Sequence, residues 1–156
     1  IITYGDLVFE KAVIDQVIDF KGDIGIAVEL DWKPHYDGRT LHPMSEADNV
    51  LFDKEGNIIE IRKNIQKPNS KIGEFAGIVK LSKNGSNILL KKFCELQKYH
   101  NGRFHNAPSL KQSIIPDMIQ ELIDSEIKVE PILISGKWYE IDTPQDLEIA
   151  QKKIEK

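Results

Sequence analysis

The sequence has little of several features that would point quickly to a function. It contains one cysteine, Cys94, in 156 residues, which excludes a disulfide framework and a cysteine metal site and favours a reducing, cytoplasmic compartment. No stretch reaches about 18 consecutive apolar residues, so we expect no membrane span. No basic run accompanies the net charge of -4, which argues against a nucleic-acid partner.

The composition and the hydrophobic pattern indicate a folded α/β domain over residues 1–156. The chain is 40% hydrophobic and 29% charged, which is typical of globular proteins. Segments with the apolar pattern of strands alternate with segments that have the periodicity of helices, and a hairpin lies in the middle. This order predicts an α/β domain with a mixed sheet. The predicted strands cover residues 1–9 with a turn at Gly5-Asp6, 23–30, a hairpin over 49–63, 73–82, 128–135 and 137–141. The predicted helices cover residues 10–20, 87–99 and 109–125, the last with a kink or a later start at Pro116, and a final segment after Thr143.

The first candidate for chemistry is Asp6, which follows Gly5 at the end of the first strand segment. Ligands of open α/β sheets sit beyond the carboxyl ends of strands, where an aspartate can hold a divalent cation. Gly-Asp is also ordinary turn chemistry. Both interpretations stay open for Asp6 on its own.

The second candidate is Asp142, in the segment KWYEIDTPQDLE. Thr143 is a good helix N-cap, Pro144 suits the first turn, and Asp146 at N3 completes a capping-box start. The helix start is therefore accounted for without Asp142, which is free to point at a cleft. Mg²⁺ commonly uses one or two carboxylates together with substrate phosphates, so Asp6 and Asp142 would suit a shared site.

Three segments, TYGDLVF, GEFAGIVKLS and GKWYEIDTPQDLEIA, together resemble the nucleotidyltransferase family with the glycosyltransferase-A-like fold. Within that family the chain is similar to phosphocholine cytidylyltransferases and to the cytidylyltransferase domain fused to phosphoenolpyruvate mutase. The resemblance implies a Rossmann-like, mixed-sheet domain in which Asp6 and Asp142 are catalytic residues that bind Mg²⁺. It also implies nucleotidyl transfer, cytidylyl in this branch, from a nucleoside triphosphate such as CTP. The acceptor would be a phosphorylated or phosphonate small molecule, such as phosphocholine or aminoethylphosphonate, with release of pyrophosphate.

The resemblance also suggests which residues bind the acceptor. Glu74 and Gly77 lie on the strand that contacts the acceptor in sugar-type members, although Gly77 can equally mark a bulge or close packing. Aromatic faces and a carboxylate can hold a cationic head group, and this would assign Trp32, Tyr36, Trp138 and Glu140 to the acceptor. Strand aromatics such as Trp138 more often belong to a core.

One family feature is missing from the sequence, the Gly-rich G-x-G-x-R-x-x-P loop and the lysine that follows it. Backbone N–H groups of such a loop cradle a triphosphate, so no nucleotide-binding residue can be named here. We expect the chain to be an N-terminally truncated remainder that binds metal and acceptor and is inactive alone. Two alternatives stay open: a sugar-phosphate nucleotidyltransferase, and a non-catalytic binding or assembly module, for example a homodimer that covers bare sheet surface.

Overall fold

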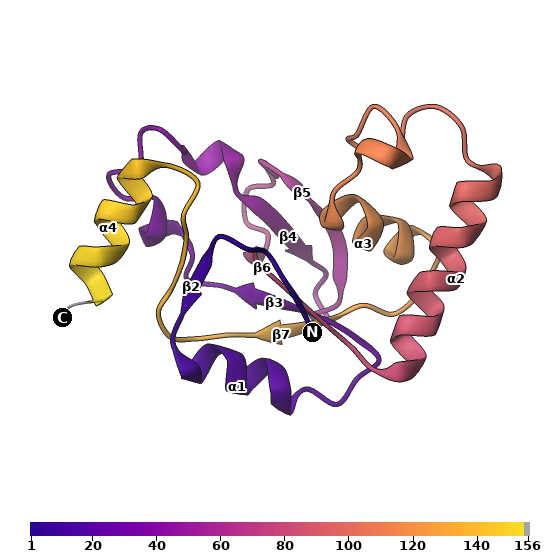
Figure 1. Cartoon of the computed structure of the whole chain (residues 1–156), viewed down its shortest axis with the longest axis horizontal. Helices are drawn as coiled ribbons and strands as arrows, with labels where there is room; N and C mark the ends of the chain where they lie inside the picture. The colour runs from indigo at the N-terminus through magenta and orange to yellow at the C-terminus, as the bar shows by residue number, and fades with distance from the viewer. Residues whose placement is uncertain (155–156) are drawn as a thin grey trace.

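The computed structural model describes residues 1–154 and is built around a six-stranded mixed sheet (Figure 1). In spatial order the strands are β5 (Ile58–Lys63), β4 (Asp48–Phe52), β6 (Ile72–Leu81), β3 (Ile24–Glu29) and β7 (Glu130–Leu133), and β1 (Ile2–Thr3) also pairs with β6. Only the β3–β7 pair is parallel among these described pairs. A separate antiparallel ribbon pairs β2 (Leu7–Phe9) with β8 (Trp138–Glu140). The predicted mixed-sheet α/β fold is confirmed.

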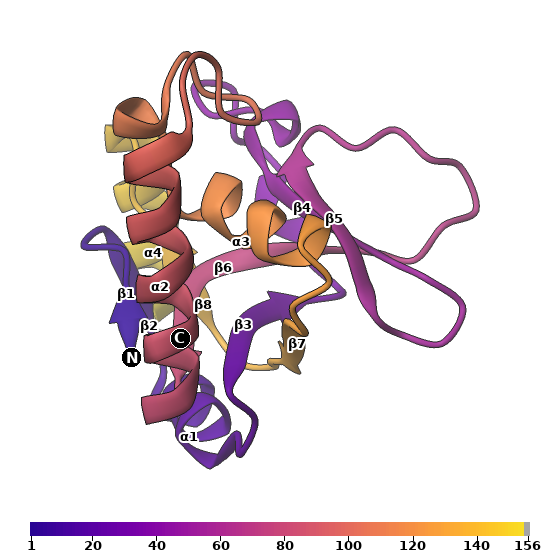
Figure 2. The same cartoon turned by 90° about the vertical axis from the view of Figure 1, so that its right-hand side faces the viewer.

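Helices cover both faces of the sheet because buried strand residues alternate between two apolar clusters. Ile26 and Val28 of β3 pack with Ile119 and Leu122 of α3 (Ile115–Asp124), and α2 (Lys83–Tyr99) borders the same cluster. Ala27 packs instead with the cluster that contains α1 (Lys11–Asp19) and the indole of β8. Figure 2 shows α2 and α3 next to each other, with α1 below them. Among residues 1–154, no helix combines the length and apolar character that a bilayer-spanning segment requires.

Two helices begin at other residues than the hydrophobic pattern alone predicts. Helix α2 begins at Lys83 rather than at residue 87, because the side chain of Ser82 caps it by accepting from the Gly85 N–H at 3.0 Å. Helix α3 begins at Ile115 rather than at residue 109, with Pro116 in its first turn. The Asp117 carboxylate then accepts from the Ile114 N–H at 3.0 Å, which satisfies an orphan donor at the helix start. Of the two outcomes expected for the proline, the later start is the correct one.

The final helix, α4 (Pro144–Ile154), begins as predicted. The Asp146 carboxylate accepts from the Thr143 N–H at 2.9 Å, and the Asp146 N–H donates to the Thr143 hydroxyl at 3.3 Å. This reciprocal pair is a capping box. The polar segment 31–47 forms two short 3-10 turns, Lys33–Tyr36 and Met44–Glu46, and lies against the start of α4.

Candidate functional site

The β2–β8 ribbon brings the two ends of the chain to one place. Leu7 pairs with Glu140, and the Ile141 N–H donates to the Asp6 carbonyl at 2.9 Å. The Gly5-Asp6 and Asp142 segments, 136 positions apart (142 − 6), are therefore neighbours at one end of the ribbon. The backbone therefore brings Asp6 close to the segment of Asp142, as a site shared by the two residues requires.

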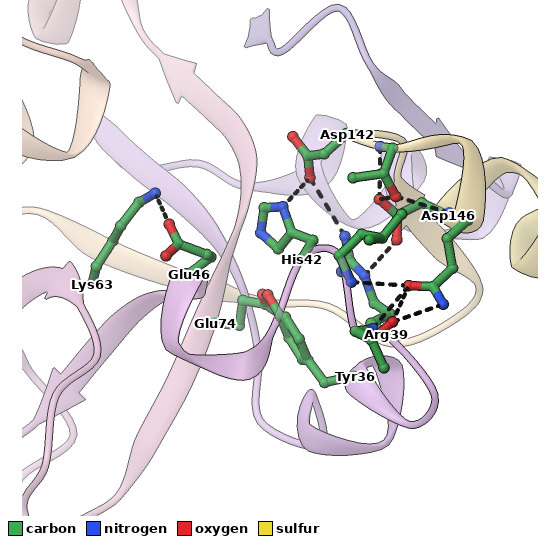
Figure 3. Close-up of polar contacts among 12 residues, drawn as sticks. Tyr36, Arg39, His42, Glu46, Lys63, Glu74, Asp142 and Asp146 are labelled. Carbon is green, nitrogen blue, oxygen red and sulfur yellow. Dashed lines mark hydrogen bonds and ion pairs between the residues drawn. The ribbon is translucent and has the colours of Figure 1, made fainter.

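The Asp142 carboxylate contacts two side chains of the 31–47 loop. Its Oδ2 lies 3.0 Å from His42 Nδ1 and 3.4 Å from Arg39 Nη2, and Figure 3 shows both side chains pointing at it. Ligand atoms of His42, Glu140 and Asp142 all lie within 4.8 Å of one another, a spacing that could hold a metal ion. The exposed Asp6 side chain is not in this group.

Arg39 is fixed from behind by the helix-capping acid. Its Nε donates to Asp146 Oδ1 at 2.7 Å, and the two side chains are only 7% and 3% exposed. Its guanidinium also lies 4.9 Å from the centre of the Tyr36 ring, a favourable cation–π distance. The side chain of Gln145 accepts from the Thr40 N–H at 2.8 Å, so the first turn of α4 holds the loop at two points.

Glu140 precedes Asp142 by two residues, and the charges of Asp142 and Asp6 both act on its carboxyl group. Burial, together with the charges of Asp142 and Asp6, raises the pKa of Glu140 to about 7. A buried carboxyl among like charges resists ionisation unless a cation is supplied. The carboxylates at this end of the ribbon therefore have the charge that a divalent cation would neutralise.

A pocket opens beside this group, between the central sheet, the loop and β8. It has about 310 Å³ of empty volume, including its mouth. The lining residues are His35, Arg39, Glu74, Trp138, Tyr139, Glu140, Asp146 and Ile149. Four of the predicted site positions thus lie at or beside one cavity, since Glu74, Trp138 and Glu140 line it and Asp142 is in contact with Arg39.

Glu74, which lines the pocket, belongs to a row of polar residues on neighbouring strands. Glu74 of β6 lies directly opposite Glu29 of β3 and Asn49 of β4, so the three side chains share one face of the sheet. Glu29 Oε2 accepts from Trp138 Nε1 at 2.6 Å and lies 3.2 Å from His35 Nε2. Burial raises the pKa of Glu29 and lowers that of His35.

Glu74 is the most deeply buried acid of the row, at 3% exposure. The Tyr36 hydroxyl donates to its Oε1, but its Oε2 has no hydrogen-bond partner among residues 1–154. Burial, with the nearby charge of Glu140, raises the pKa of Glu74 to about 8 despite the Tyr36 hydrogen bond, which lowers it. A buried acceptor without a donor is costly in a folded protein.

The remaining predicted site residues lie outside the pocket lining. Trp32 and Tyr36 are buried in a small cluster with Ala47. Trp32 donates to the Ile72 carbonyl at 3.2 Å, whereas Tyr36 reaches the pocket through its bond to Glu74. Gly77 has φ +67°, and a Cβ there would lie 2.9 Å from the Tyr4 ring. The bulge and close-packing interpretation accounts for this glycine.

Four residues of the site were missed as site residues in the sequence: Glu29, Arg39, His42 and Asp146. Arg39 carries no local signal in the sequence, yet it is buried against Asp146. Glu29 did carry a signal, because it is an acid within the otherwise apolar run DIGIAVEL. Lys, Glu, Arg and Asp are rarely buried unless they are paired, so such an acid marks a candidate position.

No family model matches the chain. In sequence it is similar to CTP:phosphoglutamine cytidylyltransferase of Campylobacter jejuni, with 25% identity over 156 residues, 98% of this chain and 59% of that protein. The chain therefore spans well under two thirds of the length of that relative.

Two solved structures share the fold. One is assigned as a glucose-1-phosphate thymidylyltransferase of Bacillus anthracis, in complex with a sucrose (TM-score 0.58, 16% identity, 97% of this chain and 52% of that one). The other is the inositol-1-phosphate CTP transferase of T. maritima (TM-score 0.59, 19% identity, 96% of this chain and 52% of that one). The predicted resemblance to nucleotidyltransferases, in fold and in sequence, is confirmed.

Proposed function

We propose that the protein transfers a cytidylyl group from CTP to a phosphorylated or phosphonate small molecule and releases pyrophosphate. The observation that carries this proposal is the pairing of β2 with β8, which places Asp6 beside the segment of Asp142. The sequence relative supports cytidylyl transfer, because it is named for the use of CTP and of a phosphorylated acceptor.

In this proposal Asp6 and Asp142 hold Mg²⁺, and the surrounding acids fit that role. Burial, together with the charges of these two carboxylates, raises the pKa of Glu140, and carboxylate oxygens are the ligands that Mg²⁺ prefers. When bound, the metal supplies charge stabilisation for phosphate oxygens during in-line displacement. His42 and Arg39 orient the Asp142 carboxylate.

The other pocket residues position the acceptor. Glu74, Trp138 and Glu140 line the cavity next to Asp142, while Tyr36 holds Glu74 in place through its hydroxyl. An acceptor bound there has its phosphate or phosphonate near the carboxylate group, where an oxygen can attack the α-phosphorus of CTP. Phosphocholine, aminoethylphosphonate and, by analogy with the relative, phosphoglutamine are the acceptors to test first.

The test is an Asp142→Ala substitution in the full-length gene product, assayed for pyrophosphate release with CTP, Mg²⁺ and these acceptors. We expect turnover to fall at least about 100-fold while the thermal unfolding midpoint changes little, because Asp142 is partly exposed. Asp37→Ala is the matched control and should leave the rate unchanged, since Asp37 is an exposed acid of the 31–47 loop that contacts Asp142. Near-normal turnover in the Asp142 variant would rule out its assignment as a metal ligand.

A sugar-phosphate nucleotidyltransferase is the second candidate, favoured by the shared fold with a protein assigned as a glucose-1-phosphate thymidylyltransferase. A screen of four nucleoside triphosphates against sugar phosphates and the amine-bearing acceptors separates the two functions. Preference for a sugar phosphate supports the second candidate. Absence of transfer with every pair in the full-length product supports the binding or assembly module instead.

A further inference from the structure

The strongest unexplained feature of the molecule is the free oxygen of Glu74. The residue is 3% exposed, it lines the pocket, and its Oε2 has no donor among the described residues. Its other oxygen is already fixed by the Tyr36 hydroxyl, so the carboxylate cannot rotate to find a partner without losing that bond. An N–H group of a ligand would supply the missing donor.

The charges around the pocket favour a cationic ligand. Among the described residues that line the cavity, Arg39 is the only arginine or lysine, and Asp146 already pairs with it at 2.7 Å. Glu74 and Glu140 then have no cation of their own in the lining, and Glu29 lies directly opposite Glu74. Burial and neighbouring acids favour the protonated Glu74 carboxyl in the absence of a cation, and a bound ammonium group would favour its ionised form.

The size of the pocket limits what the cation can be. Its enclosed part has room for a group about the size of a water molecule, which an ammonium group matches. A trimethylammonium group is larger and carries no N–H donor for Glu74.

We propose that this pocket binds the primary ammonium group of the acceptor, with Glu74 Oε2 accepting one of its N–H bonds and Glu140 completing the negative surroundings. The inference deepens the proposed function and rests on it for the anionic part of the acceptor. It selects phosphorylated or phosphonate primary amines over their quaternary and hydroxyl analogues.

The test compares three acceptors that share a phosphate and a two-carbon spacer: 2-aminoethyl phosphate, phosphocholine and 2-hydroxyethyl phosphate. Each is assayed with the full-length protein, saturating CTP and Mg²⁺, and kcat/KM is measured. We expect the primary amine to exceed both analogues roughly 30-fold or more, as for a buried charged hydrogen bond. Equal values for the amine and the hydroxyl compound, or a preference for phosphocholine, would overturn the inference.

Glu74→Gln identifies the residue responsible. Glutamine keeps the side-chain volume and one oxygen that can accept from Tyr36, but it presents an NH2 donor where Oε2 was. The preference for the amine over the hydroxyl compound should therefore disappear, while the KM for CTP is unchanged. Glu60→Gln is the matched control, because Glu60 lies on β5 and pairs with Arg62 and Lys67 at the surface. An amine preference retained in Glu74→Gln would overturn the assignment.

Calorimetric titration with 2-aminoethyl phosphate in the absence of CTP separates the two proposals. Binding that is lost in Glu74→Gln, without cytidylyl transfer to any acceptor, supports the ammonium site and contradicts the proposed function. Cytidylyl transfer to all three acceptors at equal rates supports the proposed function and contradicts the ammonium site. The comparison of acceptors on the unmodified protein does not depend on whether any variant folds.

Discussion

Replacing Glu74 by glutamine should stabilise the protein, and more strongly as the pH rises. Glu74 is buried with one unpaired oxygen, and its pKa is raised from the ordinary 4.5 to about 8. The folded protein therefore holds a proton that the unfolded chain releases above pH 4.5. Between these two values the folded state binds more protons, so the free energy of unfolding falls as pH rises.

The size of the effect follows from the same two values. Each pH unit between them lowers the free energy of unfolding by about 1.4 kcal/mol, and the whole interval corresponds to about 5 kcal/mol. Glutamine does not titrate and resembles the protonated acid in shape. The stability difference between the variant and the unmodified protein should therefore grow by about 2 to 3 kcal/mol from pH 6 to pH 8.

Urea unfolding followed by circular dichroism at several pH values measures this difference. Asp48, whose pKa is also raised by burial, affects both proteins alike and cancels in the comparison. Glu60→Gln should run parallel to the unmodified protein above pH 6, because hydrogen bonds from Arg62 and Lys67 keep the pKa of Glu60 low although burial opposes them. Parallel profiles for Glu74→Gln would refute the reasoning that Glu74 is buried without a full set of partners.

Three further substitutions test the packing around the site by urea unfolding. Arg39→Met should destabilise the protein by about 3 kcal/mol or more, because it leaves the buried Asp146 carboxylate uncompensated. A neutral effect would mean that the pair contributes nothing to folding. Gly85→Ala should destabilise the protein by about 2 kcal/mol or more, because the new Cβ would lie 2.0 Å from the Asp23 carbonyl oxygen. This clash outweighs the better helix propensity of alanine. An unchanged urea midpoint would contradict that contact. Leu122→Ala removes a fully buried side chain and should cost about 2 to 5 kcal/mol, which a change below 1 kcal/mol would exclude.

The fold was largely predictable because the sheet depends on apolar runs that are visible locally. The strand containing Ala27 reads as a buried run and is buried at every position. The error at the start of α2 came from Gly85, which has a poor helix propensity. Its presence in the helix is explained by close packing on Asp23, which is a contact between distant residues and leaves no mark in the local pattern.

The candidate site was predictable only in part. The pairing of Asp6 with the Asp142 segment was reached through a family resemblance, whereas the local sequence of each allowed a plain turn or a cap. Contacts of Arg39 and His42 with Asp142 join positions about a hundred residues apart, so no spacing rule reveals them. By contrast, Glu29 and Glu74 lie inside apolar runs, and that local inconsistency is itself a signal of function.

The β2–β8 ribbon can form only after nearly all of the described residues have been synthesised, because it pairs strands from the two ends of the sequence. Leu7 and Glu140 are 133 positions apart (140 − 7), and closing so long a loop carries an entropic penalty before any contact compensates it. A nascent chain has no complete pocket until Ile149, the last lining residue, has been synthesised and the ribbon has closed. A ligand of this pocket would therefore bind only the folded form and would shift the folding equilibrium toward it, so ligand affinity reports on whether the β2–β8 ribbon has closed.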